Sequence, residues 1–159
     1  MTELPHVYTV VAVAGATGDV ALRAARLPAL ASAPPAEFGG PRDRWSPESL
    51  LSAAVADCFV LTFRALARRS NVEWIALTCE VDGTVDRVDR MVCFTRFALR
   101  ARLRVPAGSD VEAARRLLDQ AERKCLISNS LAAQIHLDAE IDLEVDGADA
   151  TARVEAAHR

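Results

Sequence analysis

Hydrophobic and polar positions along the chain first predict one long helix. An apolar stretch follows Ser46-Pro47-Glu48 and continues to about Ser70, and its first two-thirds are apolar nearly all round. Ser46 suits the N-cap, Pro47 the first helical position, and Glu48 the first turn near the positive end of the helix dipole. A helix that is apolar on most sides has to be surrounded by protein. We therefore expect this segment to be the central core helix.

Strand patterns lie on both sides of this helix. Residues 7–14 and 20–27 are rich in β-branched and apolar side chains and flank two glycines, which predicts a hairpin. After the helix, two segments alternate between apolar and polar positions. Their apolar faces are expected to carry Ile75, Leu77, Cys79, Val81 and Val85 in the first, and Cys93, Phe97, Leu99, Ala101, Leu103 and Val105 in the second. Cys79 and Cys93 are thus expected to be buried core thiols.

Charged residues indicate which strands are neighbours. The polar face of the second strand carries Arg96, Arg100, Arg102 and Arg104, and a later strand over residues 137–145 carries Asp138, Glu140, Asp142 and Glu144. Opposite charges on paired strands stabilise each other, so these two strands suit each other as neighbours. Between them Asp110 caps an amphipathic helix that ends near Lys124, and residues 128–134 predict another short helix. Strands grouped around helices without βαβ alternation indicate an α+β fold with a mainly antiparallel sheet.

Length and composition set the limits of this fold. The 159 residues are 51% hydrophobic and 26% charged, which predicts one globular domain over residues 1–146 and a flexible C-terminal tail over 147–159. A net charge of −3 argues against a nucleic acid partner. The longest apolar-rich run, residues 50–63, is judged too short to span a bilayer, and the first residues lack the pattern of a signal peptide. We expect a cytoplasmic protein with no membrane partner.

Four cysteines are the candidates for chemistry: Cys58, Cys79, Cys93 and Cys125. Their spacing contains no Cys-x-x-Cys pair, which argues against a metal held by thiolates. Cys58 lies inside the apolar helix, so from position alone it is either a buried inert thiol or a reactive one. Cys125 follows Arg123 and Lys124 at a break between helices, where cations would stabilise a thiolate; the alternative is a partly exposed cysteine with no role.

Two motifs resemble the two cysteine regions of the OsmC/Ohr family, the osmotically inducible and organic hydroperoxide resistance proteins. The first comprises FGGP at residues 38–41, SPESLL at 46–51, AA at 53–54 and DCF at 57–59; the second is AERKCLISNSL at 121–131. The resemblance covers about residues 7–145. It implies an intertwined homodimer whose curved, mainly antiparallel sheet wraps around long central helices, with the active sites at the dimer interface.

The same resemblance implies the chemistry. Cys58 matches the cysteine that attacks a peroxide and becomes a sulfenic acid, and Cys125 matches the cysteine that resolves it to a disulfide. No cofactor is implied, and an external dithiol is the electron donor. Glu48 matches the glutamate that holds an arginine beside the thiolate. That arginine is expected to be Arg42 or Arg44, in a Pro- and Gly-rich loop over residues 31–44, because the early strand where some relatives carry it has none.

The sequence departs from the family pattern at Leu126, where most relatives have a proline directly after the second cysteine. The leading hypothesis is a thiol peroxidase that reduces organic hydroperoxides, and hydrogen peroxide as a possible second substrate, under oxidative stress. Two alternatives stay open. One is a non-catalytic dimer that binds an apolar small molecule, and the other is a redox sensor.

Overall fold

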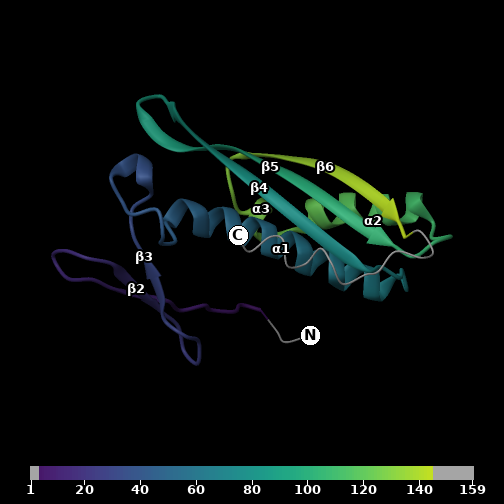
Figure 1. Cartoon of the computed structure of the whole chain (residues 1–159), viewed down its shortest axis with the longest axis horizontal. Helices are drawn as coiled ribbons and strands as arrows, with labels where there is room; N and C mark the ends of the chain where they lie inside the picture. Colours follow the sequence, from purple (N-terminus) through teal and green to yellow (C-terminus); the bar gives the residue numbers. More distant parts are fainter. Residues whose placement is uncertain (1–3, 145–159) are drawn as a thin grey trace. The chain divides into compact units, whose positions relative to one another are not determined.

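The computed structural model describes residues 4–144, which divide into two compact units (Figure 1). The first unit extends to Leu51 and the second begins at Ser52, so the boundary falls inside the long helix α1, Pro47–Arg69. The expectation of one domain over residues 1–146 stays a prediction, and the tail expected over 147–159 lies outside the described residues. Helices and two sheets confirm the mixed α+β class.

The first unit is built on a three-stranded antiparallel sheet in the order β1-β2-β3. Its strands are Val11–Val13, Val20–Arg23 and Leu30–Ser32, so the predicted hairpin is confirmed and a third strand is added to it. A 3-10 helix, η1, follows at Ala36–Phe38. The loop then packs tightly around Gly40. A Cβ at this position would lie 1.6 Å from the Pro34 carbonyl oxygen, so only glycine, which has no Cβ, fits there.

Helix α1 begins where the sequence predicts. The Ser46 Oγ accepts a hydrogen bond from the Ser49 N–H at 3.2 Å, and the Ser49 Oγ accepts one from the Ser46 N–H at 2.8 Å. This reciprocal pair is a capping box with serine in place of the usual glutamate. The helix is less enclosed than expected, because its fully buried side chains form one stripe: Val55, Phe59, Phe63, Leu66 and Ala67.

The same helix corrects one expectation about membranes. Over residues 4–144, α1 is the one helix whose length and composition would allow it to cross a membrane, so the short-run argument from residues 50–63 is wrong. The core helix of a water-soluble protein passes the same test. The finding therefore does not change the expected cytoplasmic location, which stays a prediction.

The second unit contains a three-stranded sheet in the order β4-β5-β6 (Figure 1). Strands β4 (Ala76–Val88) and β5 (Met91–Val105) are antiparallel, whereas β6 (Gln134–Leu143) is parallel to β5. Parallel neighbours need a crossover, and helices α2 (Val111–Lys124) and α3 (Leu126–Asn129) supply it. The expected absence of a βαβ unit is therefore wrong, and the short helix predicted at 128–134 lies earlier.

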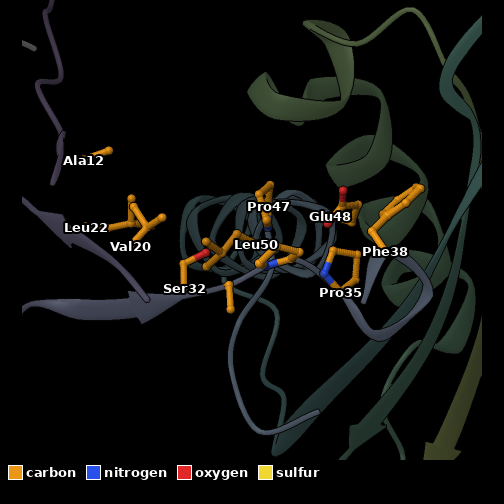
Figure 2. A pocket seen from close by; sticks show the side chains of 11 residues that line it. Ala12, Val20, Leu22, Ser32, Pro35, Phe38, Pro47, Glu48 and Leu50 are labelled. Atoms are coloured by element: carbon orange, nitrogen blue, oxygen red, sulfur yellow. The ribbon is translucent and has the colours of Figure 1, made fainter. Parts of the chain in front are cut away.

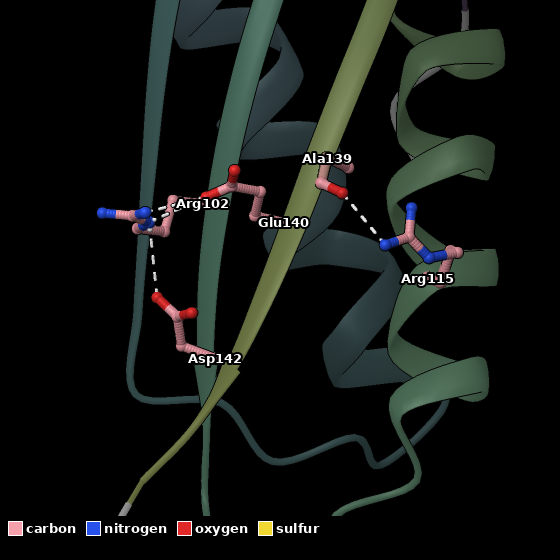
Figure 3. A network of polar contacts seen from close by, with 5 residues as sticks. All are labelled: Arg102, Arg115, Ala139, Glu140 and Asp142. Carbon is pink, nitrogen blue, oxygen red and sulfur yellow. Dashed lines mark hydrogen bonds and ion pairs between the residues drawn. The ribbon is translucent and has the colours of Figure 1, made fainter.

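One face of this sheet carries the predicted charge pairs. The Arg102 guanidinium contacts Glu140 at 2.8 Å and Asp142 at 3.3 Å on the neighbouring strand (Figure 3). Arg100 pairs with β4 instead, at 2.6 Å from Asp82 and 2.8 Å from Glu80. These side chains are exposed, so each pair contributes little to stability but favours this register.

The other face forms the core of the second unit. Its buried residues come from α1, α2 and β5, and β5 contributes Phe97, Leu99, Ala101, Leu103 and Val105. Where β4 passes α1 the two come very close, since a Cβ on Gly83 would lie 2.8 Å from the Ser52 Oγ. The predicted inner face of β5 is therefore correct from Phe97 onward.

Before Phe97, a β-bulge in β5 makes the observed faces of the strand differ from the predicted ones. Thr84 pairs with Arg96 but Val85 pairs with Phe94, so Thr95 is an extra residue in β5. One extra residue turns every following side chain to the opposite face. Phe94 consequently stacks on Phe97 with ring centroids 4.9 Å apart, and Cys93 is exposed. The expectation that Cys93 is a core thiol is wrong for this reason.

Candidate active site

Cys58 lies near the middle of α1 and is half-buried. It lines a cleft of about 540 Å³ in the second unit. Most of the lining comes from one stripe of α1, and the rest from the junction of α2 and α3. The lining residues are Ala54, Asp57, Cys58, Leu61, Thr62, Ala65, Leu66, Arg69, Lys124 and Ile127. Cys58 is thus a thiol with access to a largely apolar cleft.

Cys125 occupies the junction between two helices. It ends α2, where its N–H donates to the Glu122 carbonyl oxygen at 3.2 Å, and it caps the start of α3. Its side chain is completely buried. Its thiol lies close enough to that of Cys58 for the two groups to influence each other. The fold therefore brings together two cysteines that are 67 residues apart in the sequence.

The electrostatic setting of Cys125 differs from the expected one. Burial raises the pKa of its thiol, hydrogen bonds from the Ser128 side chain and backbone oppose that rise, and the Cys58 thiol adds to it. The expectation that Arg123 and Lys124 hold Cys125 as a thiolate is therefore wrong. Lys124 instead lines the cleft beside Cys58. A buried, protonated thiol behind a more accessible one suits a resolving cysteine better than an attacking one.

A second cation at this cleft was missed from the sequence. Arg69 lines the same cleft as Cys58 although it lies eleven residues further along α1. Eleven residues make close to three helical turns, so both side chains share a face. That spacing is the signal that would have revealed it.

The predicted arginines and Glu48 belong to the first unit. The Arg44 Nε lies 2.7 Å from an Asp19 carboxylate oxygen, and its Nη1 lies 2.9 Å from one of Asp43. Arg42 and Arg44 together line a shallow cleft of about 330 Å³. The structure therefore brings the two arginines to one place, and their approach to Cys58 together with Glu48 stays a prediction.

Glu48 lines a different cavity, of about 490 Å³, within the first unit (Figure 2). Its walls come from the small sheet, the Pro-rich loop and the start of α1, and its lining is mainly apolar: Ala12, Val20, Leu22, Ser32, Ala33, Pro34, Pro35, Phe38, Pro47, Glu48 and Leu50. An apolar cavity with one carboxylate has the composition of a small-molecule site. No sequence pattern predicted it.

Over residues 4–144, no three His, Cys, Asp or Glu side chains gather in a way that would hold a metal ion. The chemistry that these residues offer directly is that of two neighbouring thiols beside an apolar cleft. Two such thiols are able to form a disulfide.

Comparison with known proteins assigns the family. The profile of the OsmC-like protein family matches residues 40–140, which include both cysteines, and the chain belongs to this family. Among curated relatives, the uncharacterized protein YmaD of Bacillus subtilis is 27% identical over 71% of this chain and 77% of its own length. Peroxiredoxin OsmC of Escherichia coli is 29% identical over 58% of this chain, and the match spans 64% of the E. coli protein.

Solved structures agree on the fold. An OsmC-like protein of unknown function from Vibrio cholerae has a TM-score of 0.80 at 12% identity, covering 86% of this chain and all of that one. An organic hydroperoxide resistance protein from Legionella pneumophila has a TM-score of 0.69 at 22% identity, covering 88% of this chain and 99% of that one. At these identities the likeness shows the fold.

Proposed function

We propose that this protein is a thiol-dependent peroxidase that reduces organic hydroperoxides through a Cys58 sulfenic acid and a Cys58–Cys125 disulfide. The observation that carries the proposal is the proximity of a thiol lining an apolar cleft to a second, buried thiol. Relatives named peroxiredoxin and organic hydroperoxide resistance protein support it.

The first step is attack by the Cys58 thiolate on the distal oxygen of the hydroperoxide. The sulfur–oxygen bond forms while the oxygen–oxygen bond breaks, and the alkoxide leaves and takes up a proton as the alcohol. Cys58 is then a sulfenic acid and the peroxide has received two electrons. The apolar side chains of the cleft, among them Leu61 and Ile127, suit the alkyl part of such a substrate.

Cys125 completes the second step. Its sulfur attacks the Cys58 sulfur and hydroxide leaves, taking the thiol proton of Cys125 to form water. The raised pKa of Cys125 keeps its proton in place until this step requires it. The disulfide then returns to two thiols by exchange with an external dithiol, which is the electron donor in this proposal.

Activation of Cys58 needs a cation, because burial alone favours the neutral thiol. We assign this role to Arg42 or Arg44, positioned by Glu48, within one chain or across a homodimer. A homodimer also accounts for the partly uncovered apolar surface of α1, where Leu61 is 48% exposed. A cytoplasmic location, a reducing compartment, is part of the same proposal.

Consumption of cumene hydroperoxide and of hydrogen peroxide by the purified protein, with dihydrolipoamide or dithiothreitol, tests the proposal. We expect turnover with the organic hydroperoxide and a slower reaction with hydrogen peroxide, which gains nothing from the apolar walls. The matched controls are Cys58→Ser, which removes the attacking thiol, and Cys93→Ala, which removes an exposed thiol outside the cleft. Turnover by wild type and Cys58→Ser at equal rates would refute it.

The apolar cavity beside Glu48 favours a second candidate, binding of an apolar small molecule without catalysis. A protein of this kind would show no thiol-dependent peroxide consumption. It would bind an apolar fluorescent probe, and Leu22→Asp, which places a charge in the cavity wall, would weaken that binding.

A further inference from the structure

A third cysteine shares the interior of the second unit with Cys58 and Cys125. Cys79 is on β4, where the half-buried positions alternate with exposed ones: Leu77, Cys79, Val81 and Gly83 are half-buried. Its partner in the register is Ala101 of β5, which is only 3% exposed. Cys79 therefore lies on the inner face of the sheet, the face that α1 and α2 cover.

The packing of β4 against α1 places Cys79 close to the level of Cys58. The two elements run in opposite directions (Figure 1), and Gly83 lies directly against Ser52. Going back from Gly83 to Cys79 covers about 13 Å along the strand. Going forward from Ser52 to Cys58 covers about 9 Å along the helix. These two distances differ by less than one helical turn, so Cys79 and Cys58 lie at nearly the same level along α1.

Electrostatics connect Cys79 to Cys125 as well. Burial, and in second place the nearby Cys125, raise the pKa of Cys79 to about 11. Cys125 in turn interacts with the Cys58 thiol. Cys125 is therefore the member of the cluster that interacts with both other thiols.

We propose that Cys79 is a second partner of Cys125: it attacks the Cys125 sulfur of the Cys58–Cys125 disulfide, forms a Cys79–Cys125 disulfide and releases Cys58. This inference rests on the proposed function, which supplies the first disulfide. One sulfur–sulfur bond breaks and one forms, the proton of the Cys79 thiol passes to Cys58 or to water, and no further oxidant or reductant is needed.

The direction of this exchange follows from the three environments. Cys58 must be a thiolate to attack peroxide, and a sulfur that is stable as a thiolate is the better leaving group in the exchange. A more basic sulfur such as Cys79 is the stronger nucleophile once it is deprotonated. The exchange returns a free Cys58 to the cleft and stores the oxidising equivalents on the inner face of the sheet. The oxidised protein would then keep an alkylatable Cys58.

Peptide mapping tests this, because tryptic cleavage places the four cysteines on separate peptides, residues 45–64, 70–87, 91–96 and 125–153. The full chain is treated with one equivalent of cumene hydroperoxide, quenched with acid at increasing times, and alkylated in denaturant. We expect Cys58–Cys125 first, followed by Cys79–Cys125 with Cys58 alkylated. In Cys79→Ala and Cys79→Ser, Cys58–Cys125 should persist and Cys58 should stay blocked. Cys93→Ala should behave as wild type.

The outcomes separate this inference from the proposed function. If wild type ends as Cys58–Cys125 with Cys79 alkylated, the exchange is wrong and the peroxidase proposal stands. If peroxide forms no disulfide, the peroxidase proposal fails, and the same time course with diamide, which oxidises thiols directly, decides on the exchange. Cys79–Cys125 appearing after Cys58–Cys125 in that experiment supports it. Its absence there overturns it.

Discussion

The thiols and the arginines that are expected to act together are held in different ways. Cys58, on α1, and Cys125, at the junction of α2 and α3, lie close together inside the second unit. Arg44, in the first unit, already has two acidic partners, Asp19 and Asp43. The two thiols are thus held within one unit, whereas the arginines proposed to activate Cys58 belong to the other. We therefore expect disulfide formation and thiolate activation to respond to different mutations.

Removal of Cys58 should have the largest effect. Cys58→Ser should abolish peroxide turnover, because a serine hydroxyl cannot accept oxygen from a peroxide as a thiolate does. Cys125→Ser should still react once, and then stall or pass to the sulfinic acid, because no thiol is present at that position to condense with the sulfenic acid. Stopped-flow peroxide consumption and intact mass measure both results. Full multiple-turnover activity in Cys125→Ser would show that Cys125 does not resolve the intermediate.

The arginines should have the next largest effect. Replacing the arginine that approaches Cys58 by methionine, which keeps much of the packing of the stem, should raise the Cys58 pKa and slow the peroxide reaction at least tenfold. We favour Arg42, because two ion pairs already hold Arg44. The rate of Cys58 alkylation against pH gives the pKa for Arg42→Met, Arg44→Met and the double variant.

Lys124→Met tests the competing source of the cation, because Lys124 belongs to the second unit and lines the same cleft as Cys58. It should move the alkylation curve less than replacement of the arginine that approaches Cys58. If Lys124→Met moves the curve and the three arginine variants do not, the cation comes from the second unit. The thiols and the activating cation would then belong to the same unit.

The sequence predicts well those features that depend on local pattern. Serine and proline at the start of α1, and the facing arginines and acids of β5 and β6, both lie where expected. Features set by pairing geometry were not predictable. A single extra residue, Thr95, exposes Cys93, and the parallel direction of β6 depends on how the chain crosses over after β5.

The candidate site also contains features that the sequence predicted and features that depend on tertiary packing. Family resemblance pointed to Cys58 and Cys125, and the structure adds that the two thiols lie close together. Neighbouring cations in the sequence suggested a thiolate at Cys125, but its side chain is completely buried and burial raises its pKa. Burial depends on tertiary packing, which charges close by in the sequence do not reveal. The cleft residue Arg69 and the proximity of Cys79 to Cys125 likewise come from packing.

A smaller effect should appear in the pH dependence of stability. Folding raises the pKa of Cys79 from its ordinary value of 9.0 to about 11. The folded state therefore holds the thiol proton more tightly, and its stability falls as pH rises from about 9 towards 11. After allowance for partial exposure of the side chain, we expect a loss on the order of 1 kcal/mol. Urea unfolding under reducing conditions at pH 8 and pH 10.5 measures it. Cys79→Ala should lose less than wild type over this interval; equal losses would contradict the assignment.

Cys93 should give the smallest effect, and it provides the sharpest contrast with Cys79 on the neighbouring strand. Because the bulge at Thr95 exposes Cys93, Cys93→Ala should change the free energy of unfolding by less than about 0.5 kcal/mol, as surface substitutions generally do. Peroxide turnover should equal that of wild type. Urea unfolding at pH 7 measures the first quantity, with Cys79→Ala beside it as the half-buried counterpart. A larger destabilisation by Cys93→Ala than by Cys79→Ala would mean that Cys93 is covered in solution, and that the hairpin joining β4 and β5 packs against another surface.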